Sequence, residues 1–361
     1  MLRAGGTALI AEAGVNHNGS LPRALEMVDV AARAGADAIK FQSFKAELLA
    51  TSQAPKAQYQ VRGTSASESQ LDMLRALELD RAAHHALAAR CRERGIAFLS
   101  TPFDLDSLAL LAGELQMPML KISSGDLTNG PLLHAAARTG KSVLLSTGMA
   151  TLEEIGAALA VLAHGYVERD AAPSAHALAE ARASAAGMQA VRDRVTLLQC
   201  TTEYPAAPGD LNLRAMGGLK ARFGTRIGFS DHSTGIEAAI AAAALGAEVI
   251  EKHFTLDRAL PGPDHAASVE PAELARLVEA LRIVELALGS GEKAPAAAEL
   301  RNVAAARKSL VAARDVRRGE AFTADNLAAM RPGTGLSPLK YWDWIGRAAG
   351  RDYRAGELVD E

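Results

Sequence analysis

The sequence of 361 residues predicts a (β/α)8 TIM barrel followed by a small C-terminal domain. Eight short apolar runs occur within the first 255 residues, and nearly every run ends in polar, reactive residues. Buried parallel strands read as continuous apolar runs because helices cover both faces of the sheet. In such a barrel the active site collects at the carboxyl ends of the strands. The polar residues that follow the runs therefore predict the position of the site.

The predicted strands lie, in chain order, within ALIAEAGVNHNG, AIKFQSF, AFLSTPFD, MLKISSGD, SVLLSTGM, VTLLQCTTEYP, RIGFSDHST and EVIEKHFTLD. Alanine- and leucine-rich segments with helical spacing separate them, and several of these end at a glycine, as helices often do. Two segments interrupt the alternation. Residues 46–80 follow a strand directly, which predicts an active-site loop, whereas residues 167–194 follow a helix, which predicts an insert on the opposite face.

The predicted barrel domain covers residues 1–288, with a final helix over residues 271–288. Residues 289–304 are predicted to be a linker because they are rich in glycine, proline and alanine. Residues 305–361 have glycine or proline every few residues, which predicts a second domain of short strands and turns. This domain is too small to bury a large core, so we expect it to dock on another surface.

The composition excludes several classes of partner. Lys and Arg total 39 against 42 Asp and Glu, and no basic groove or long run of one charge argues for nucleic acid. No segment approaches the roughly 18 consecutive apolar residues of a membrane span. The two cysteines form neither a disulfide framework nor a paired-cysteine zinc motif. We therefore expect a cytoplasmic enzyme with reduced thiols.

Two histidines suggest a metal site. His232 follows the seventh apolar run and His253 ends the eighth, so a closed barrel would place them side by side. Imidazoles with oxygen ligands and open water positions suit Mn, Fe, Co or Zn better than Ca, and such a metal can act as a Lewis acid on a carbonyl. The alternative is that each histidine is only hydrogen-bonded to a neighbour. Cys200, at the end of the sixth run, is the remaining candidate for a third ligand.

Two lysines suggest an anion site. Lys40 and Lys121 end the second and fourth runs and are expected to point into the barrel. Ammonium groups, hydroxyls and the backbone of SSGD and STGM would form a cradle for phosphate or carboxylate. The neighbouring polar residues are Gln42, Ser123, Ser124, Ser146, Thr147 and Ser230. The alternative is that each lysine pairs with an acid such as Glu12 or Asp126.

Glu12 is a carboxylate among apolar neighbours at a strand end, where a raised pKa would suit acid or base chemistry. Further hydrogen-bonding groups for a polyhydroxylated substrate come from Gln58, Tyr59, Gln60, Glu203, Tyr204 and Asp264. An anion cradle, a Lewis-acid metal and a polyol pocket together suggest the addition of a phosphorylated carbon nucleophile to a sugar aldehyde.

At these residues the chain resembles the sialic acid synthase family, which condenses phosphoenolpyruvate with an N-acyl mannosamine-type sugar to give a nine-carbon 2-keto acid. The resemblance covers nearly the whole chain. Its tail is similar to the antifreeze-like (SAF-type) domain of these enzymes. The matching motifs are EAGVNHNG, IKFQSFKA, KAQYQ, FLSTPFD, KISSGD, LSTGMAT, CTTEYP, GFSDHSTG, EKHFTLD and PGPDH, followed by ARKSLVA and RPGTG.

The resemblance implies roles for individual residues. His232 and His253 would hold a divalent metal, typically Mn2+, with Mg2+ or Co2+ as alternatives. Phosphoenolpyruvate would be bound by Lys40, Thr101, Lys121, Ser124, Ser146 and Ser230. The sugar would meet Gln42, Tyr59, Gln60, Thr202, Tyr204 and Asp264. Glu12, Lys40, Lys121 and Asp126 would be catalytic, and Arg331 would reach the partner subunit's active site in a domain-swapped homodimer.

The implied reaction begins with attack of phosphoenolpyruvate C3 on the metal-polarised sugar aldehyde. Water then adds at C2, and phosphate leaves by C–O cleavage while Lys40 and Lys121 balance the negative charge. Two positions depart from some members, which often have glutamate at Asp126 and asparagine at Thr202. These two departures leave the sugar preference open. The insert at residues 167–194 is also longer than usual, and its role is open.

Three alternatives follow from the same residues. The first is a legionaminic acid synthase that uses 2,4-diacetamido-2,4,6-trideoxymannose, a choice that depends on the loop at residues 46–80. The second is a metal-dependent hydrolase on the same barrel, which would leave the two lysines and the serines without a role. The third is an ice- or carbohydrate-binding role for the tail, in which RPGTG is too short and irregular to form a flat repetitive array.

Overall fold

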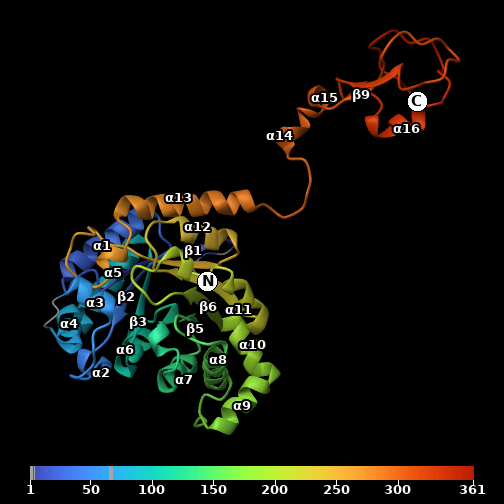
Figure 1. Cartoon of the computed structure of the whole chain (residues 1–361). Helices are drawn as coiled ribbons and strands as arrows, with labels where there is room; N and C mark the ends of the chain where they lie inside the picture. Colours follow the sequence, from blue (N-terminus) through green and yellow to red (C-terminus); the bar gives the residue numbers. More distant parts are fainter. Residues whose placement is uncertain (1–2, 4, 65–67) are drawn as a thin grey trace. The chain divides into compact units, whose positions relative to one another are not determined.

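The structure, a computed structural model, describes residues 3, 5–64 and 68–361 (Figure 1). The chain forms two compact units, Met1–Gly289 and Ser290–Glu361. The predicted assignment of residues 289–304 to a linker stays a prediction. Among the described residues, no helix combines the length and apolar character needed to cross a membrane.

The first unit is the predicted barrel. Its eight strands are parallel and hydrogen-bonded in the order β3-β2-β1-β8-β7-β6-β5-β4, and β3 also contacts β4, so the sheet nearly closes. Every predicted apolar run contains one strand. The strands are β1 (Ala8–Gly14), β2 (Ala38–Ser43), β3 (Ala97–Pro102), β4 (Met119–Ile122), β5 (Ser142–Ser146), β6 (Val195–Cys200), β7 (Arg226–Asp231) and β8 (Val249–His253).

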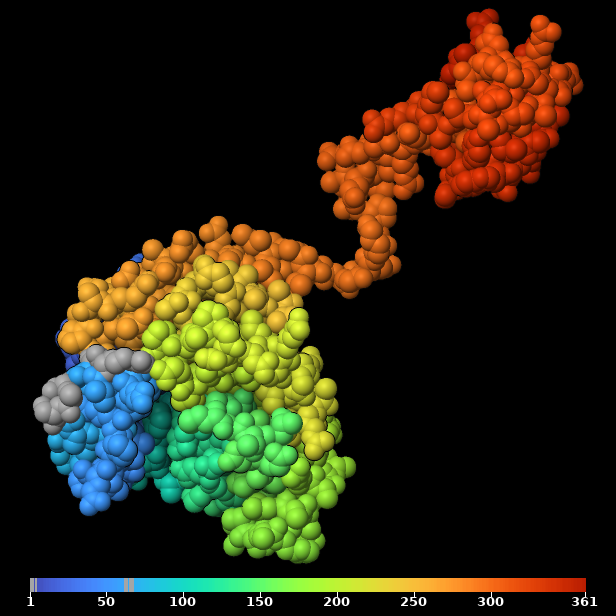
Figure 2. All heavy atoms as spheres, in the orientation of Figure 1, coloured from blue at the N-terminus to red at the C-terminus, as the bar shows by residue number. Residues whose placement is uncertain are grey.

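Helices connect the strands on the outside of the barrel. They are α1 (Leu21–Ala34), α5 (Arg81–Arg94), α6 (Leu105–Ala109), α7 (Gly130–Arg138), α8 (Leu152–Val167), α11 (Ala215–Phe223), α12 (Glu237–Ala244) and α13 (Pro271–Leu288). Figure 2 shows α12 and α13 side by side on the surface of this unit. The predicted glycine ends occur at Gly35 after α1 and Gly95 after α5, both in the left-handed conformation that glycine adopts without a steric penalty.

Successive side chains of each strand point alternately into the barrel and towards the helices, so the apolar residues form two layers. One cluster lies inside the barrel and includes Ile10, Leu99 and Leu198. A larger cluster lies between the strands and the helices and includes Leu9 and Ala11 on β1. Because successive side chains of a strand point to opposite faces, the inward position of Ile10 also directs Glu12 into the barrel.

The two predicted interruptions contain short helices. The loop after β2 contains α2 (Ala46–Leu49), α3 (Gln58–Gly63) and α4 (Gln70–Leu77), while its residues 65–67 lie outside the described part of the chain. The insert contains α9 (Ala175–Ala183) and α10 (Ala185–Arg194), which contact α8. Since α10 runs directly into the start of β6, the insert leads to the amino end of that strand, as predicted.

The second unit has a small sheet in which β9 (Ser309–Ala312) pairs antiparallel with β10 (Leu327–Met330). Its core includes Leu310, Phe322 and Trp344. The helical elements are α14 (Ala297–Leu300), α15 (Val303–Ala306) and α16 (Tyr341–Trp344). Leu339 and Trp342 are 86% and 79% exposed.

Candidate active site

A cavity of about 350 Å³ opens at the carboxyl ends of the barrel strands. Every strand contributes at least one side chain to its wall or supports a loop that does. The predicted site residues that line it are Glu12, Lys40, Gln42, Tyr59, Gln60, Thr101, Lys121, Ser124, Ser146, Thr202, Tyr204, Ser230, His232 and His253. The cavity thus brings together residues that are far apart in the sequence, as the barrel prediction required.

The floor of the cavity is a cluster of buried charges. Lys40 Nζ lies 2.6 Å from Glu12 Oε2 and 2.9 Å from Thr101 Oγ1. Lys121 Nζ lies 3.2 Å from one oxygen of Glu251, whose other oxygen is 3.7 Å from Lys40 Nζ. Glu251 therefore links the two lysines. Both lysines point inward as predicted, and each is paired with an acid.

Glu251 was missed by the sequence analysis, although a signal was present. It precedes His253 by two positions on β8, so both side chains lie on the same face of that strand. Its carboxylate also accepts a hydrogen bond from Ser230 Oγ at 2.8 Å. The EKHF run could therefore have indicated an inward carboxylate beside an inward histidine.

The two carboxyl groups of the floor have opposite pKa shifts. Burial raises the pKa of Glu12 to about 7, against the attraction of Lys40, and the charge of Glu251 adds to the increase. Burial would also raise the pKa of Glu251, but the ammonium groups of Lys121 and Lys40 outweigh it and lower that pKa to about 2. Neighbouring groups with separated pKa values are typical of acid and base assignments in active sites.

The predicted histidine pair forms at the end of the adjacent strands β7 and β8. The ring centroids of His232 and His253 are 5.4 Å apart, and both side chains are buried. Burial lowers the pKa of His232 to about 4 and that of His253 well below its ordinary value. Both imidazoles are therefore neutral at neutral pH, which is the state that binds metals.

The hydrogen bonds of the histidines also fit a metal. His232 Nδ1 lies 2.6 Å from the carbonyl oxygen of Thr201, and a proton donated there leaves Nε2 unprotonated, 3.3 Å from Ser230 Oγ. His253 Nδ1 is buried without a hydrogen-bond partner in the described structure and lies 3.7 Å from Asp264 Oδ2. No group of three or more His, Cys, Asp or Glu residues able to hold a metal occurs in the described part of the chain.

The Tyr204 ring, from the segment after β6, contacts both histidines, and the Tyr59 ring from the loop after β2 contacts Tyr204. The Tyr204 ring is 4.1 Å from that of His232 and 4.6 Å from that of Tyr59, measured between centroids. Tyr59 lies on α3, so the loop predicted to belong to the active site does line the cavity. Burial raises the pKa of Tyr204 well above its ordinary value, so its hydroxyl remains protonated.

A close approach of backbone to side chains forms another wall. A Cβ on Gly148 would lie 2.2 Å from Thr202 Oγ1, so only glycine fits at this position. The Gly148 N–H donates to Ser124 Oγ at 3.0 Å and to Cys200 Sγ at 3.1 Å. Cys200 therefore contacts the STGM backbone and not the histidine pair.

Three predicted site residues lie outside the cavity lining. Asp126 accepts hydrogen bonds from Ser123 Oγ and Asn129 Nδ2 and so stabilises the turn before α7. Asp264 is buried beside His253, and burial raises its pKa to about 6. Arg331 belongs to the second unit, where its Nε donates to the carbonyl oxygen of Ala306.

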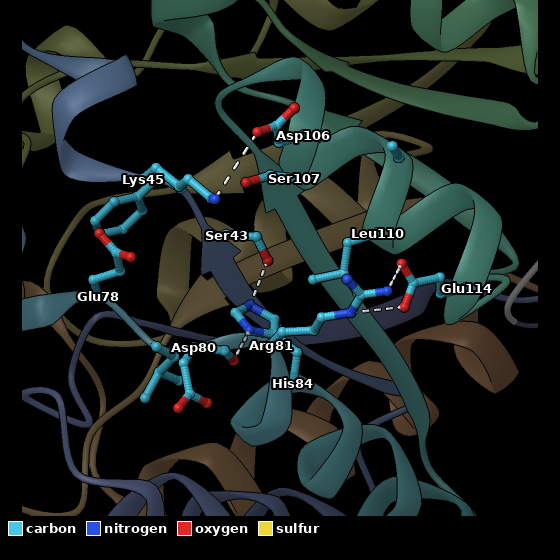
Figure 3. A pocket seen from close by; sticks show the side chains of 13 residues that line it. Ser43, Lys45, Glu78, Asp80, Arg81, His84, Asp106, Ser107, Leu110 and Glu114 are labelled. Atoms are coloured by element: carbon cyan, nitrogen blue, oxygen red, sulfur yellow. Dashed lines mark hydrogen bonds and ion pairs between the residues drawn. The ribbon is translucent and has the colours of Figure 1, made fainter.

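A second cavity of about 440 Å³ lies beside β2 and β3 and contains none of the predicted site residues (Figure 3). Its charged groups pair with one another, as in the contacts of Arg81 with Glu114 and of Lys45 with Asp106. Its buried Ser43 Oγ is 2.6 Å from His84 Nε2. The first cavity is lined by most of the predicted site residues, so we take it as the candidate active site.

Comparisons with known proteins match both parts of the chain to known families. Residues 27–293 match the NeuB family and residues 307–361 match the SAF domain. The N,N'-diacetyllegionaminic acid synthase of Campylobacter jejuni is 46% identical over 98% of this chain and 99% of its own length. The synthase of the same name from Legionella pneumophila is 40% identical over 97% of this chain and 92% of its own.

A solved structure extends the similarity to three dimensions. The N-acetylneuraminic acid synthetase of Leptospira borgpetersenii, in complex with citrate, is 36% identical, with a TM-score of 0.66 over 82% of this chain and 90% of that chain. The predicted fold and family are therefore confirmed. This chain belongs to the NeuB family and is a nonulosonic acid synthase with a C-terminal SAF domain.

Proposed function

We propose that this enzyme condenses phosphoenolpyruvate with 2,4-diacetamido-2,4,6-trideoxymannose to give N,N'-diacetyllegionaminic acid and phosphate. The observation that carries the choice of sugar is the 46% identity, over almost the full length of both chains, to a synthase of that name. The sequence analysis placed an N-acyl mannosamine sugar first and this sugar second. N-acetylmannosamine, which would give N-acetylneuraminate, remains the second candidate because a structure of that type is 36% identical.

The charged floor supports a site for phosphoenolpyruvate. Lys40 and Lys121 are 2% and 5% exposed and lie on the same side of the cavity as Ser124, Ser146 and Ser230. Ser146 Oγ is buried without a hydrogen-bond partner in the described structure and is available to an incoming anion. Two buried ammonium groups with adjacent hydroxyls can bind a phosphate and a carboxylate together.

The proposed resident metal is Mn2+, with Mg2+ or Co2+ as alternatives, held by His232 and His253. When bound, it would supply Lewis-acid polarisation of the sugar carbonyl. The donor set fits this role because both imidazoles are neutral and Nδ1 of His253 lacks a partner. Asp264, 3.7 Å from that nitrogen, would orient the ring or contact the sugar.

The side chains of the floor would carry out the remaining steps. C3 of phosphoenolpyruvate forms a bond to the aldehyde carbon, and the aldehyde oxygen takes up a proton. Water adds at C2, and the C2–O bond to the phosphate then breaks. Glu12, with a pKa of about 7, can exchange a proton at Oε2 at neutral pH, and Lys40 and Lys121 stabilise the negative charge of the tetrahedral species.

We further propose that the enzyme is a domain-swapped homodimer in which Arg331 reaches the partner subunit's active site. The exposure of Leu339 and Trp342 supports a docking role for the second unit. Asp126 is retained only as a residue that shapes the turn after β4, because its carboxylate is occupied by Ser123 and Asn129.

Product analysis tests the proposal. The enzyme is incubated with phosphoenolpyruvate and either sugar in separate reactions, and products are identified by mass spectrometry. We expect efficient formation of the legionaminic acid product and slower reaction of N-acetylmannosamine. Phosphoenolpyruvate labelled with 18O at the bridging oxygen should transfer the label to phosphate. Label retained in the keto acid would contradict C–O cleavage, and faster reaction of N-acetylmannosamine would contradict the choice of sugar.

A further inference from the structure

The active-site cavity has an apolar wall opposite in character to its charged floor. Leu49 on α2, Leu74 on α4 and Phe103 after β3 line the same cavity as Lys40 and Lys121. Each of these three apolar side chains is half-buried in the structure. We call Leu49, Leu74 and Phe103 the apolar wall. Phosphate, carboxylate and hydroxyl groups of a substrate would gain nothing from contact with this apolar wall.

The apolar wall is fixed by a packed cluster behind it. Its three side chains pack against a separate group of buried apolar residues, Val15, Phe44, Met73 and Leu77. The rings of Phe44 and Phe103 meet edge to face, with centroids 6.2 Å apart and an interplanar angle of 82°. The wall is thus held by the β2 loop on one side and faces the cavity on the other, so its position is set before substrate binds.

Amide groups stand beside the apolar wall. Gln60 on α3 and Gln70 on α4 line the cavity too, and Gln70 Nε2 lies 3.4 Å from Gln60 Oε1. Their contact is long, so the Gln70 amide can turn to a ligand without losing a strong bond, whereas Gln60 Oε1 also accepts the Ala57 N–H at 2.9 Å and is held in place. An acetamido substituent has a polar amide and an apolar methyl, and this part of the cavity offers partners for both.

We propose that the apolar wall determines the sugar specificity by receiving the apolar substituents of a deoxy amino sugar. The inference rests on the proposed function and deepens it. 2,4-Diacetamido-2,4,6-trideoxymannose has a methyl group at C6 and an acetamido group at C4, where N-acetylmannosamine has hydroxyl groups. Burial of a methyl group against leucine and phenylalanine side chains is favourable. A hydroxyl group in the same place would lose its hydrogen bonds to water and find no hydrogen-bond partner on the wall.

The first test uses the wild-type enzyme and two sugars that differ only at C6. N-acetylmannosamine and its 6-deoxy analogue are compared by their kcat/KM values at saturating phosphoenolpyruvate. We expect a preference of about tenfold or more for the 6-deoxy sugar, the range that one apolar group confers in a hydrophobic site. Equal values, or a preference for the hydroxylated sugar, would overturn the inference.

The second test changes the wall. Leu49→Asn and Leu74→Gln add polar partners, so each should reduce the preference for the 6-deoxy sugar by about fivefold or more, with an unchanged KM for phosphoenolpyruvate. Leu48→Asn is the matched control, because Leu48 is 59% exposed and does not line the cavity. Circular dichroism identifies any variant that fails to fold. In that case the comparison of the two sugars with the wild-type enzyme still tests the inference.

The outcomes separate the inference from the function on which it rests. One outcome is that the wild-type enzyme makes the legionaminic acid product, but the Leu49→Asn and Leu74→Gln variants prefer the 6-deoxy sugar as strongly as the wild type does. The apolar wall would then not determine the sugar specificity, while the proposed function would stand. If the wild-type enzyme rejects the diacetamido sugar and accepts N-acetylmannosamine equally with its 6-deoxy analogue, both proposals are wrong.

Discussion

Glu12 Oε2 and Lys40 Nζ lie 2.6 Å apart inside the barrel, and their side chains are only 2% and 3% exposed. A buried ion pair loses much of its hydration, so its net contribution to stability is small compared with the cost of breaking it on one side. The register of β1 and β2 places these two residues directly opposite each other. The pair therefore keeps a cation and a titratable carboxyl at the point where an anionic substrate would bind.

The first prediction concerns the pH dependence of the reaction. The raised pKa of Glu12, about 7, means that its carboxyl loses its proton as the pH rises through neutrality. If the carboxylate acts as a base, kcat/KM should fall about tenfold per pH unit below pH 7, since the free enzyme's ionisations shape this profile. Glu12→Gln should lower kcat by roughly a hundredfold or more and abolish the fall in kcat/KM below pH 7. If this fall remained in Glu12→Gln, another group would be responsible for the pH dependence.

The second prediction concerns the metal. Chelation should abolish synthesis and Mn2+ should restore it, because His232 and His253 are the proposed ligands. Alanine at either position should reduce activity by about a thousandfold, equivalent to about 4 kcal/mol of activation free energy. Titration of Mn2+ binding by electron paramagnetic resonance gives an independent readout. His176→Ala is the control, because this side chain is 84% exposed on α9. Full activity in metal-free buffer would refute the Lewis-acid role.

The third prediction separates the two substrates. Lys121 lies on the charged floor, so Lys121→Ala should raise the KM for phosphoenolpyruvate at least tenfold more than that for the sugar. Tyr204→Phe and Gln42→Ala should do the opposite, because their groups are assigned to the sugar. Steady-state kinetics with each substrate varied in turn makes the comparison. Equal effects on both substrates from all three variants would show that the floor has been assigned to the wrong substrate.

The sequence predicted the fold because periodic local signals agree with the global topology. Each apolar run became a strand, and glycines such as Gly35 and Gly95 ended the helices where expected. His232 and His253 could be paired from the sequence because neighbouring strands of a barrel end at the same rim. The predictions that the structure confirms are those that follow from the order of the strands and from where each strand ends.

The details that the sequence did not predict depend on contacts between side chains. Glu251 was overlooked because a single acid in an apolar strand has no local signal apart from its spacing to His253. Asp126 was predicted to be catalytic, whereas in the structure its carboxylate accepts hydrogen bonds from Ser123 and Asn129 in a short turn and the residue is not part of the cavity lining. The apolar wall combines Leu49, Leu74 and Phe103 from three separate segments, so no sequence pattern marks it.

The fourth prediction concerns stability in acid. Burial lowers the pKa of His17 to about 4 from its ordinary value of 6.5. The unfolded state therefore binds the proton first, so stability that is complete above pH 6.5 is lost as the pH falls towards 4, by up to about 3 kcal/mol for this residue. Glu12 and Asp264, whose pKa values are raised, contribute with the opposite sign. Comparing the free energy of unfolding of the wild type with that of a His17 variant isolates the contribution of this histidine.

The measurement for His17 is urea unfolding of wild type and His17→Asn at pH 7.5 and pH 5.0. Asparagine can still accept the hydrogen bond that His17 Nδ1 receives from the Gly19 N–H at 3.0 Å, and it does not titrate. We expect the free energy of unfolding to fall less with acid in the variant than in the wild type. Identical losses in both proteins would show that His17 titrates normally in the folded state.

The fifth prediction concerns the second unit. Arg331 lies in a unit with a small core, and a guanidinium can donate a directed pair of hydrogen bonds to a substrate oxygen. If Arg331 acts across a dimer, each active site requires a barrel from one chain and a tail from the other. An Arg331→Ala chain retains a sound barrel, and a His232→Ala chain retains a sound tail. Each variant alone should be nearly inactive, as each homodimer lacks one part of every site.

Unfolding the two variants together and refolding them should produce mixed dimers with one complete site. Random pairing makes about half of the dimers mixed, and half of the sites in these are complete, so activity should recover to about a quarter of the wild-type value. Size-exclusion chromatography confirms that the refolded protein is dimeric, and wild type carried through the same cycle corrects for refolding losses. Activity no greater than the sum of the separate variants would show that Arg331 acts within its own chain or has no role in the site.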